Sequence, residues 1–186
     1  MCRPDVRRFL RLALLAPLLL LLVHGDARGG EDDGSIDDAG AFFSAAARSE
    51  ATDIIRSIAA TYDRDVRVET YAQVPADLAD DLKRDGLDKF YDDWLNRRAR
   101  QVGVRGVFVL VTRTPGRVQV GTDKGTARKT FTADDREALR DALVSAFRSA
   151  RYDQGLLDGL KFVRRRMDEN TARDRNPSVP VVGVWQ

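Results

Sequence analysis

The spacing of hydrophobic and polar residues changes several times along the chain, and each change predicts a different element. Apolar residues recur every three or four positions across residues 51–62, which predicts an amphipathic helix. Residues 66–71, VRVETY, alternate apolar with polar side chains, which predicts a strand with one buried face. An aromatic stripe follows within residues 78–95, and Gly86 either divides this stretch into two short helices or bends a single one.

The centre of the chain has the strongest strand signal. Residues 107–111, VFVLV, are apolar without alternation, as in a central strand that is covered on both faces. Pro115 and Gly116 then favour a type II turn, with a longer, bulged hairpin as the alternative. Residues 117–121 should therefore pair antiparallel with the preceding strand.

Two further helices are expected towards the C-terminus. Thr132 followed by aspartates is typical of a helix N-cap, and the apolar face of that helix reaches Phe147. Asp153 is expected to cap a last helix, with the arginines at 164–166 near its C-terminal end. High charge and returning prolines predict a polar tail over residues 170–186.

The order of these elements is helix, strand, helix, two strands, helix and helix. Because the central strand is apolar on both faces, helices are needed on both sides of the sheet. We therefore expect an α/β fold. Its architecture should be a three-layer α/β/α sandwich with a small mixed sheet of three to four strands, including one antiparallel hairpin.

The N-terminal residues have the pattern of an export signal. Several arginines precede an apolar run over residues 12–23, and the small residues Gly25 and Ala27 follow it. The run is shorter than the roughly 20 residues of a membrane span, so we expect cleavage of residues 1–27, with a retained anchor as the alternative. The acidic residues 28–41 should form a disordered linker. The protein is then exported, periplasmic or membrane-peripheral on the extracytoplasmic side, without a transmembrane segment after cleavage.

Cleavage would also limit the possible chemistry. It removes Cys2 and His24, the only cysteine and the only histidine of the chain. This excludes thiolate catalysis, disulfides, Cys/His zinc sites and imidazole-dependent triads, and no zinc, haem or nucleotide cofactor is expected. It leaves equal numbers of basic and acidic residues, so nucleic acid is not an expected partner.

Four stretches carry a resemblance to a known family. They are VRVETYAQVP, GVFVLVTRTPGRVQVG, FTADDREALRDALVSAF and RYDQGLLDGLKFVRRRM. In this order they resemble the TPM domain family, which includes thylakoid-lumen photosystem II repair phosphatases, exported bacterial members and a receptor modulator of nematodes. The likeness spans roughly residues 44–168, and we expect a TPM-like α/β domain over residues 42–169. The chain departs from the family where Asp123 replaces a usual glycine and where residues 104–106 replace an Asn-rich stretch.

The resemblance implies acid-phosphatase activity and binding of a divalent cation, Ca²⁺ or Mg²⁺. Such a site would have to be built from oxygen ligands. The candidate metal ligands are Asp123, Asp88 and Asp153, and the candidate phosphate-binding residues are Gly121, Lys124 and Gly125 of the GTDKG stretch. The same residues also suit plain structural roles, with the glycines in turns, Asp123 in a turn, Asp153 as an N-cap and Asp88 on a solvated helix surface.

Two functional hypotheses follow. The first is an exported, non-catalytic module that binds and helps to maintain or assemble envelope membrane proteins. The alternative is a divalent-metal-assisted, phosphatase-like hydrolase that uses carboxylate ligands. The first is favoured because the loops expected to be catalytic depart from the family pattern.

Overall fold

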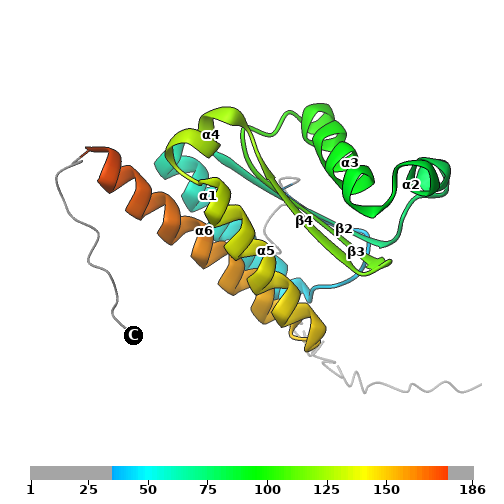
Figure 1. Ribbon diagram of the computed structural model, residues 1–186. Helices are drawn as coiled ribbons and strands as arrows, with labels where there is room; N and C mark the ends of the chain where they lie inside the picture. The colour runs from blue at the N-terminus through cyan, green and yellow to red at the C-terminus, as the bar shows by residue number, and fades with distance from the viewer. Residues whose placement is uncertain (1–34, 176–186) are drawn as a thin grey trace, which may run out of the picture.

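A four-stranded sheet forms the middle layer of the protein (Figure 1). The computed structural model describes residues 35–175, so the expected signal peptide lies outside the described residues. The strands lie side by side in the order β1 (Ile36–Asp38), β2 (Asp65–Gln73), β3 (Gly106–Thr114) and β4 (Arg117–Thr122). The first three strands run parallel, and β4 pairs antiparallel with β3. The predicted mixed sheet and its hairpin are confirmed.

Helices cover both faces of this sheet, as expected for three layers. One face carries the long helices α1 (Ala45–Tyr62), α5 (Ala133–Arg148) and α6 (Tyr152–Arg175), which Figure 1 shows together on one side. The other face carries α3 (Leu87–Val102), with the short α2 (Ala79–Asp85) beside it. A 3₁₀ turn over Ala76–Leu78 precedes α2. Gly86, at φ 73°, separates α2 from α3, so the two-helix interpretation is correct.

Each face of the sheet has its own hydrophobic core. Valines of β2, β3 and β4 pack against α1, α5 and α6 in the larger cluster. Phe108 and Leu110 of β3 face the opposite way and pack against Phe90 and Trp94 of α3. The apolar run at 107–111 is therefore central and buried on both faces, as predicted. The helices also bury both faces of β2, whereas the sequence predicted one buried face for this strand. Glu69 of β2 is consequently out of contact with solvent.

The turn between β3 and β4 differs from the prediction. A type II turn requires a positive φ at its third position. Gly86 and Gly103 have positive φ among the described glycines, but Gly116 does not. The Thr114–Pro115 peptide is cis. The hairpin itself pairs as expected, with Val109 opposite Val120.

The expected disordered linker is wrong for the part that the structure describes. Ile36 is buried and pairs with Val68 of β2. The carboxylate of Asp38 accepts hydrogen bonds from the amides of Phe42 and Phe43, at 2.9 and 3.0 Å. The short strand was missed because three residues are too few to show a period. Residues 28–34 lie outside the described residues.

The boundary of the expected tail is also wrong. Helix α6 continues to Arg175, and Asn170 is buried in it. The arginines at 164–166 consequently lie in the middle of α6, not near its end. Residues 176–186 lie outside the described residues.

Candidate functional site

The GTDKG stretch forms the start of a short helix, α4 (Lys124–Lys129). Asp123 is its N-cap, and one carboxylate oxygen accepts the amide hydrogens of Gly125 and Thr126 at 2.7 and 3.2 Å. The other oxygen accepts the Thr126 hydroxyl at 2.5 Å. Burial raises the pKa of Asp123, but these hydrogen bonds outweigh it and the net pKa is lowered. The amides expected to face a phosphate are thus already satisfied by the side chain of Asp123.

Gly121 has a packing role in the structure. It lies in β4 opposite Phe108, beneath helix α3. A Cβ atom at this position would lie 2.3 Å from Cδ2 of Leu95. The absence of a side chain therefore lets α3 approach the sheet closely, which accounts for this glycine without a bound phosphate. Lys124 begins α4 and is exposed.

The other two predicted metal ligands are engaged elsewhere. Asp88 lies in the first turn of α3, and its exposed carboxylate accepts a hydrogen bond from Nη2 of Arg117 at 2.6 Å. Asp153 accepts the amide hydrogen of Ser44 at 2.8 Å, which ties the start of α6 to the start of α1. The N-cap prediction for Asp153 is wrong, because α6 begins one residue earlier, at Tyr152.

These aspartates do not form a cluster. Within residues 35–175, no group of three or more His, Cys, Asp or Glu side chains is placed to hold a metal ion. Asp123, Asp88 and Asp153 each bind groups of the chain itself through separate contacts.

Among the described residues the carboxylates of Asp38, Glu69 and Asp135 are buried. Asp38 accepts amide hydrogens ahead of α1, Glu69 links the sheet to α3, and Asp135 links α5 to α6 within one layer. Glu69 of β2 is fully buried and accepts two hydrogen bonds from Arg98 of α3, at 2.8 and 2.9 Å. Arg67 and the hydroxyl of Tyr71 also bind it. Burial raises the pKa of Tyr71, and the hydrogen bond to Glu69 raises it further.

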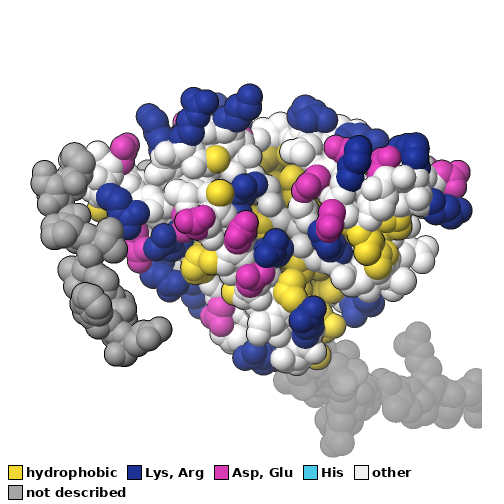
Figure 2. Space-filling view, viewed as in Figure 1, with side chains coloured by type: hydrophobic (Ala, Val, Ile, Leu, Met, Phe, Trp, Pro, Cys, Tyr) yellow, Lys and Arg dark blue, Asp and Glu magenta, His cyan; other side chains and the backbone are white. Residues whose placement is uncertain are grey.

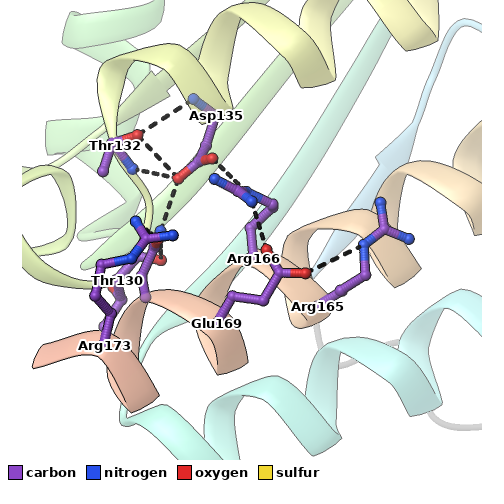
Figure 3. A network of polar contacts seen from close by, with 8 residues as sticks. Thr130, Thr132, Asp135, Arg165, Arg166, Glu169 and Arg173 are labelled. Carbon is purple, nitrogen blue, oxygen red and sulfur yellow. Dashed lines mark hydrogen bonds and ion pairs between the residues drawn. The ribbon is translucent and has the colours of Figure 1, made fainter. Parts of the chain in front are cut away.

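Asp135 is a further buried carboxylate, and Figure 3 shows its contacts. It forms a capping box with Thr132 at the start of α5, which confirms the predicted N-cap. From α6, Arg166 donates to it at 2.5 Å and Asn170 at 2.8 Å. Burial raises the pKa of Asp135, but the backbone hydrogen bond of Thr132 and the contacts with Arg166 and Asn170 outweigh it, so the net pKa is lowered. The network locks α5 onto α6.

An open groove beside the turn between β3 and β4 is the best candidate for a functional site. It lies between α5 and the β3–β4 hairpin, beside the carboxyl end of β3, and has a volume of about 660 Å³. Ligands of open α/β sheets bind outside the carboxyl ends of the strands. Figure 2 shows hydrophobic side chains at the surface in the middle of this face, among side chains of both charges. The apolar lining residues are Phe42, Val111, Val118, Val144, Phe147 and Tyr152.

Four arginines make the groove positive. Arg113, Arg117, Arg140 and Arg148 line it, against two acidic residues, Asp88 and Asp141. The side chains come from the hairpin, α3 and α5.

Arg113 is held in place without a carboxylate partner among the described residues. Its guanidinium lies 4.2 Å from the centre of the Phe42 ring and 5.6 Å from that of Tyr152. It also donates to the carbonyl oxygens of Gly40 and Ala41, at 3.2 and 3.4 Å. Stacking on aromatic faces orients a guanidinium and leaves its charge available.

Sequence reasoning missed this groove. Arg113 and Arg117 flank the predicted turn, and Arg140, Val144 and Arg148 are spaced four apart on a predicted helix. That spacing is the signal that was available. The sequence does not reveal that this stripe lies opposite the hairpin, because the two segments meet only through the packing of α5 on β4.

Comparisons with known proteins give a family match and one solved structure of similar fold. A family model described as the TPM domain matches residues 36–166, more than half of the chain. The NMR structure of the N-terminal domain of a protein from P. gingivalis is 20% identical, with a TM-score of 0.59, over 76% of this chain and 87% of that chain. The NMR structure of the BA42 protein from Bizionia argentinensis is also 20% identical, with a TM-score of 0.46, over 69% of this chain and 83% of that chain. No curated protein matches the chain. The extent of the family match establishes that this chain belongs to the TPM domain family.

Proposed function

We propose that this TPM domain is an exported, non-catalytic binding module that helps to maintain or assemble envelope membrane proteins. The observation that carries the proposal is the groove between α5 and the hairpin, with its apolar walls and four arginines. Apolar surface with a few well-placed polar groups is the usual make-up of a binding site. The two acidic side chains that line it, Asp88 and Asp141, each bind an arginine of the groove.

Contact with a membrane protein would use this surface. No helix within residues 35–175 has the length and hydrophobicity needed to span a membrane. The export signal predicted for residues 1–27 supports an envelope location. A partner's extracytoplasmic segment is therefore the ligand that we expect.

Site-specific photocrosslinking in intact cells tests the binding function. A photoreactive amino acid at Asp141, an exposed residue that lines the groove, should capture an envelope membrane protein. The same amino acid at Lys161, an exposed residue of α6 that is not part of the groove lining, is the matched control. Capture from position 141 but not from 161 supports the proposal. Equal capture from both positions, or none from 141, contradicts it.

A phosphatase assay tests the alternative hydrolase. The purified protein should not hydrolyse p-nitrophenyl phosphate with Mg²⁺ or Ca²⁺ above the rate of its Asp123→Asn variant. Asp134→Asn, which changes an exposed aspartate of α5, is the control. Activity that is lost in Asp123→Asn and kept in Asp134→Asn would favour the metal-assisted hydrolase instead.

A further inference from the structure

A stripe on α5 gives one wall of the groove a regular pattern. Arg140, Val144 and Arg148 are four residues apart and all line the groove. Residues at this spacing share one face of a helix, and eight residues of helix rise about 12 Å. The wall therefore presents a positive charge, an apolar side chain and a second positive charge in line.

Both arginines of the stripe are available to a ligand. The side chain of Arg148 is exposed and makes no hydrogen bond or ion pair with any residue in the described range 35–175. Arg140 binds its neighbour Asp141 at 2.9 Å, with both side chains largely exposed. Exposed pairs of this kind contribute little stability, so an incoming carboxylate can compete for Arg140.

The opposite wall adds a third positive charge. Arg113 lies there, fixed by Phe42 and by two backbone carbonyl groups. It lines the groove together with Val111, Phe147 and the other apolar residues. An acidic ligand in the groove would consequently meet arginines from two sides and apolar side chains between them.

The spacing of the stripe matches an extended peptide. Alternate side chains of an extended chain point to the same side, and residues i and i+4 lie about 13 Å apart. This is close to the rise between Arg140 and Arg148, and residue i+2 would then lie at Val144. We propose that the groove recognises an extended segment with acidic residues at i and i+4 and a large apolar residue at i+2. This inference rests on the proposed binding function and names its ligand.

The charges favour two separate carboxylates over one phosphate group. The positive ends of the stripe are about 12 Å apart along α5, too far for a single phosphate to bind both.

Titration with a designed peptide tests the pattern. The probe is acetyl-Glu-Ser-Leu-Ser-Glu-amide, added at millimolar concentration to the isotope-labelled purified protein. Backbone amide NMR shifts should change along residues 111–118 and 140–152. The controls are the peptide with both Glu replaced by Gln, and acetyl-Glu-Glu-Ser-Leu-Ser-amide, which has the same composition without the spacing. Both controls should bind more weakly.

Variants of the protein locate the interaction. Arg148→Gln should lower the affinity for the probe by about tenfold, because a charged hydrogen bond contributes about that factor. Arg128→Gln makes the same change of charge at an exposed position on α4 and should leave the affinity unchanged. Absence of shifts, equal affinity for the scrambled peptide, or equal effects of the two variants would overturn the inference. If photocrosslinking from position 141 still captured a membrane protein, the recognised pattern would be wrong and the binding function would stand.

Discussion

Arg98 of α3 holds the buried carboxylate of Glu69 through two hydrogen bonds. Its Nη2 lies 2.8 Å from Oε1 and its Nε 2.9 Å from Oε2. Glu69 is fully buried, whereas Arg98 lies at the edge of the layer. This pair therefore fixes the position of α3 against the sheet, because an unpaired charge at Glu69 would be costly.

Replacing Arg98 should destabilise the fold. We expect Arg98→Met to lower the free energy of unfolding by about 2–3 kcal/mol, less than for a wholly unpaired charge because Arg67 and Tyr71 still bind Glu69. Urea unfolding measures the loss. The control is Arg97→Met, because Arg97 makes a longer, exposed ion pair with Asp81 at 3.7 Å. A loss in Arg97→Met as large as in Arg98→Met would contradict this account.

Glu69 should also make stability depend on pH. Burial raises its pKa, but the hydrogen bonds from Arg98 and Tyr71 and the charges of Arg98 and Arg67 outweigh burial, so the net pKa lies below the ordinary 4.5. A lowered pKa in the folded state contributes stability above the unfolded pKa, and that contribution is lost as the pH falls through the folded value.

The corresponding measurement is the urea midpoint as a function of pH. Below about pH 4.5 the wild-type midpoint should fall more steeply than that of Glu69→Gln, since the variant lacks this proton uptake. Glu137→Gln, which alters an exposed glutamate of α5, should follow the wild-type slope. Parallel curves for wild type and Glu69→Gln would refute the assigned role.

Gly121 should tolerate no side chain. Gly121→Ala brings a Cβ atom to within 2.3 Å of Leu95, and we expect a loss of about 1–3 kcal/mol from overpacking. Gly116→Ala is the matched control, because its Cβ would meet only the carbonyl oxygen of Arg113 at 3.7 Å. If both variants unfolded at the same temperature, α3 would be able to move away from the added Cβ at little cost, and the packing role of Gly121 would be wrong.

Asn170 should contribute to the joint between α5 and α6. Its side-chain amide donates to Asp135 at 2.8 Å and to the carbonyl of Thr130 at 3.1 Å. Asn170→Ala leaves the Thr130 carbonyl without this donor, and we expect a loss of about 1–3 kcal/mol. Asp174→Ala, at an exposed position one turn further along α6, should change stability little. If the two variants unfold at the same urea concentration, the buried network contributes nothing measurable.

Asp123 should act as a helix cap. Asp123→Ala is expected to cost about 1 kcal/mol, whereas Asp123→Asn keeps an acceptor for the amides of Gly125 and Thr126 and should cost less. A cation raises the melting temperature only if it binds the folded protein. Because the Asp123 carboxylate is engaged by the amides of α4, we expect no rise on adding Mg²⁺ or Ca²⁺. If the metal raised the melting temperature of the wild type but not of Asp123→Asn, Asp123 would be a metal ligand.

The sequence by itself determined the layers of the fold. The apolar run at 107–111 requires helices on both faces of its strand. The spacing of apolar residues in the neighbouring segments predicts those helices. Local chemistry was equally readable at Thr132, where the N-cap depends on residues within one turn. These signals depend on residues that are close together in the chain, so they can be read from the sequence alone.

Only the tertiary structure decided which polar groups are buried, paired or available. Glu69 looks like a surface residue in an alternating strand, yet α3 covers it. Asp123 has the chemistry of a metal ligand, but it satisfies amides two and three residues ahead. Arg113 and Arg148 face the same groove from segments that are distant in the sequence. Burial and charge pairing depend on which surfaces meet, and that is set by packing between elements, not by the order of residues within one.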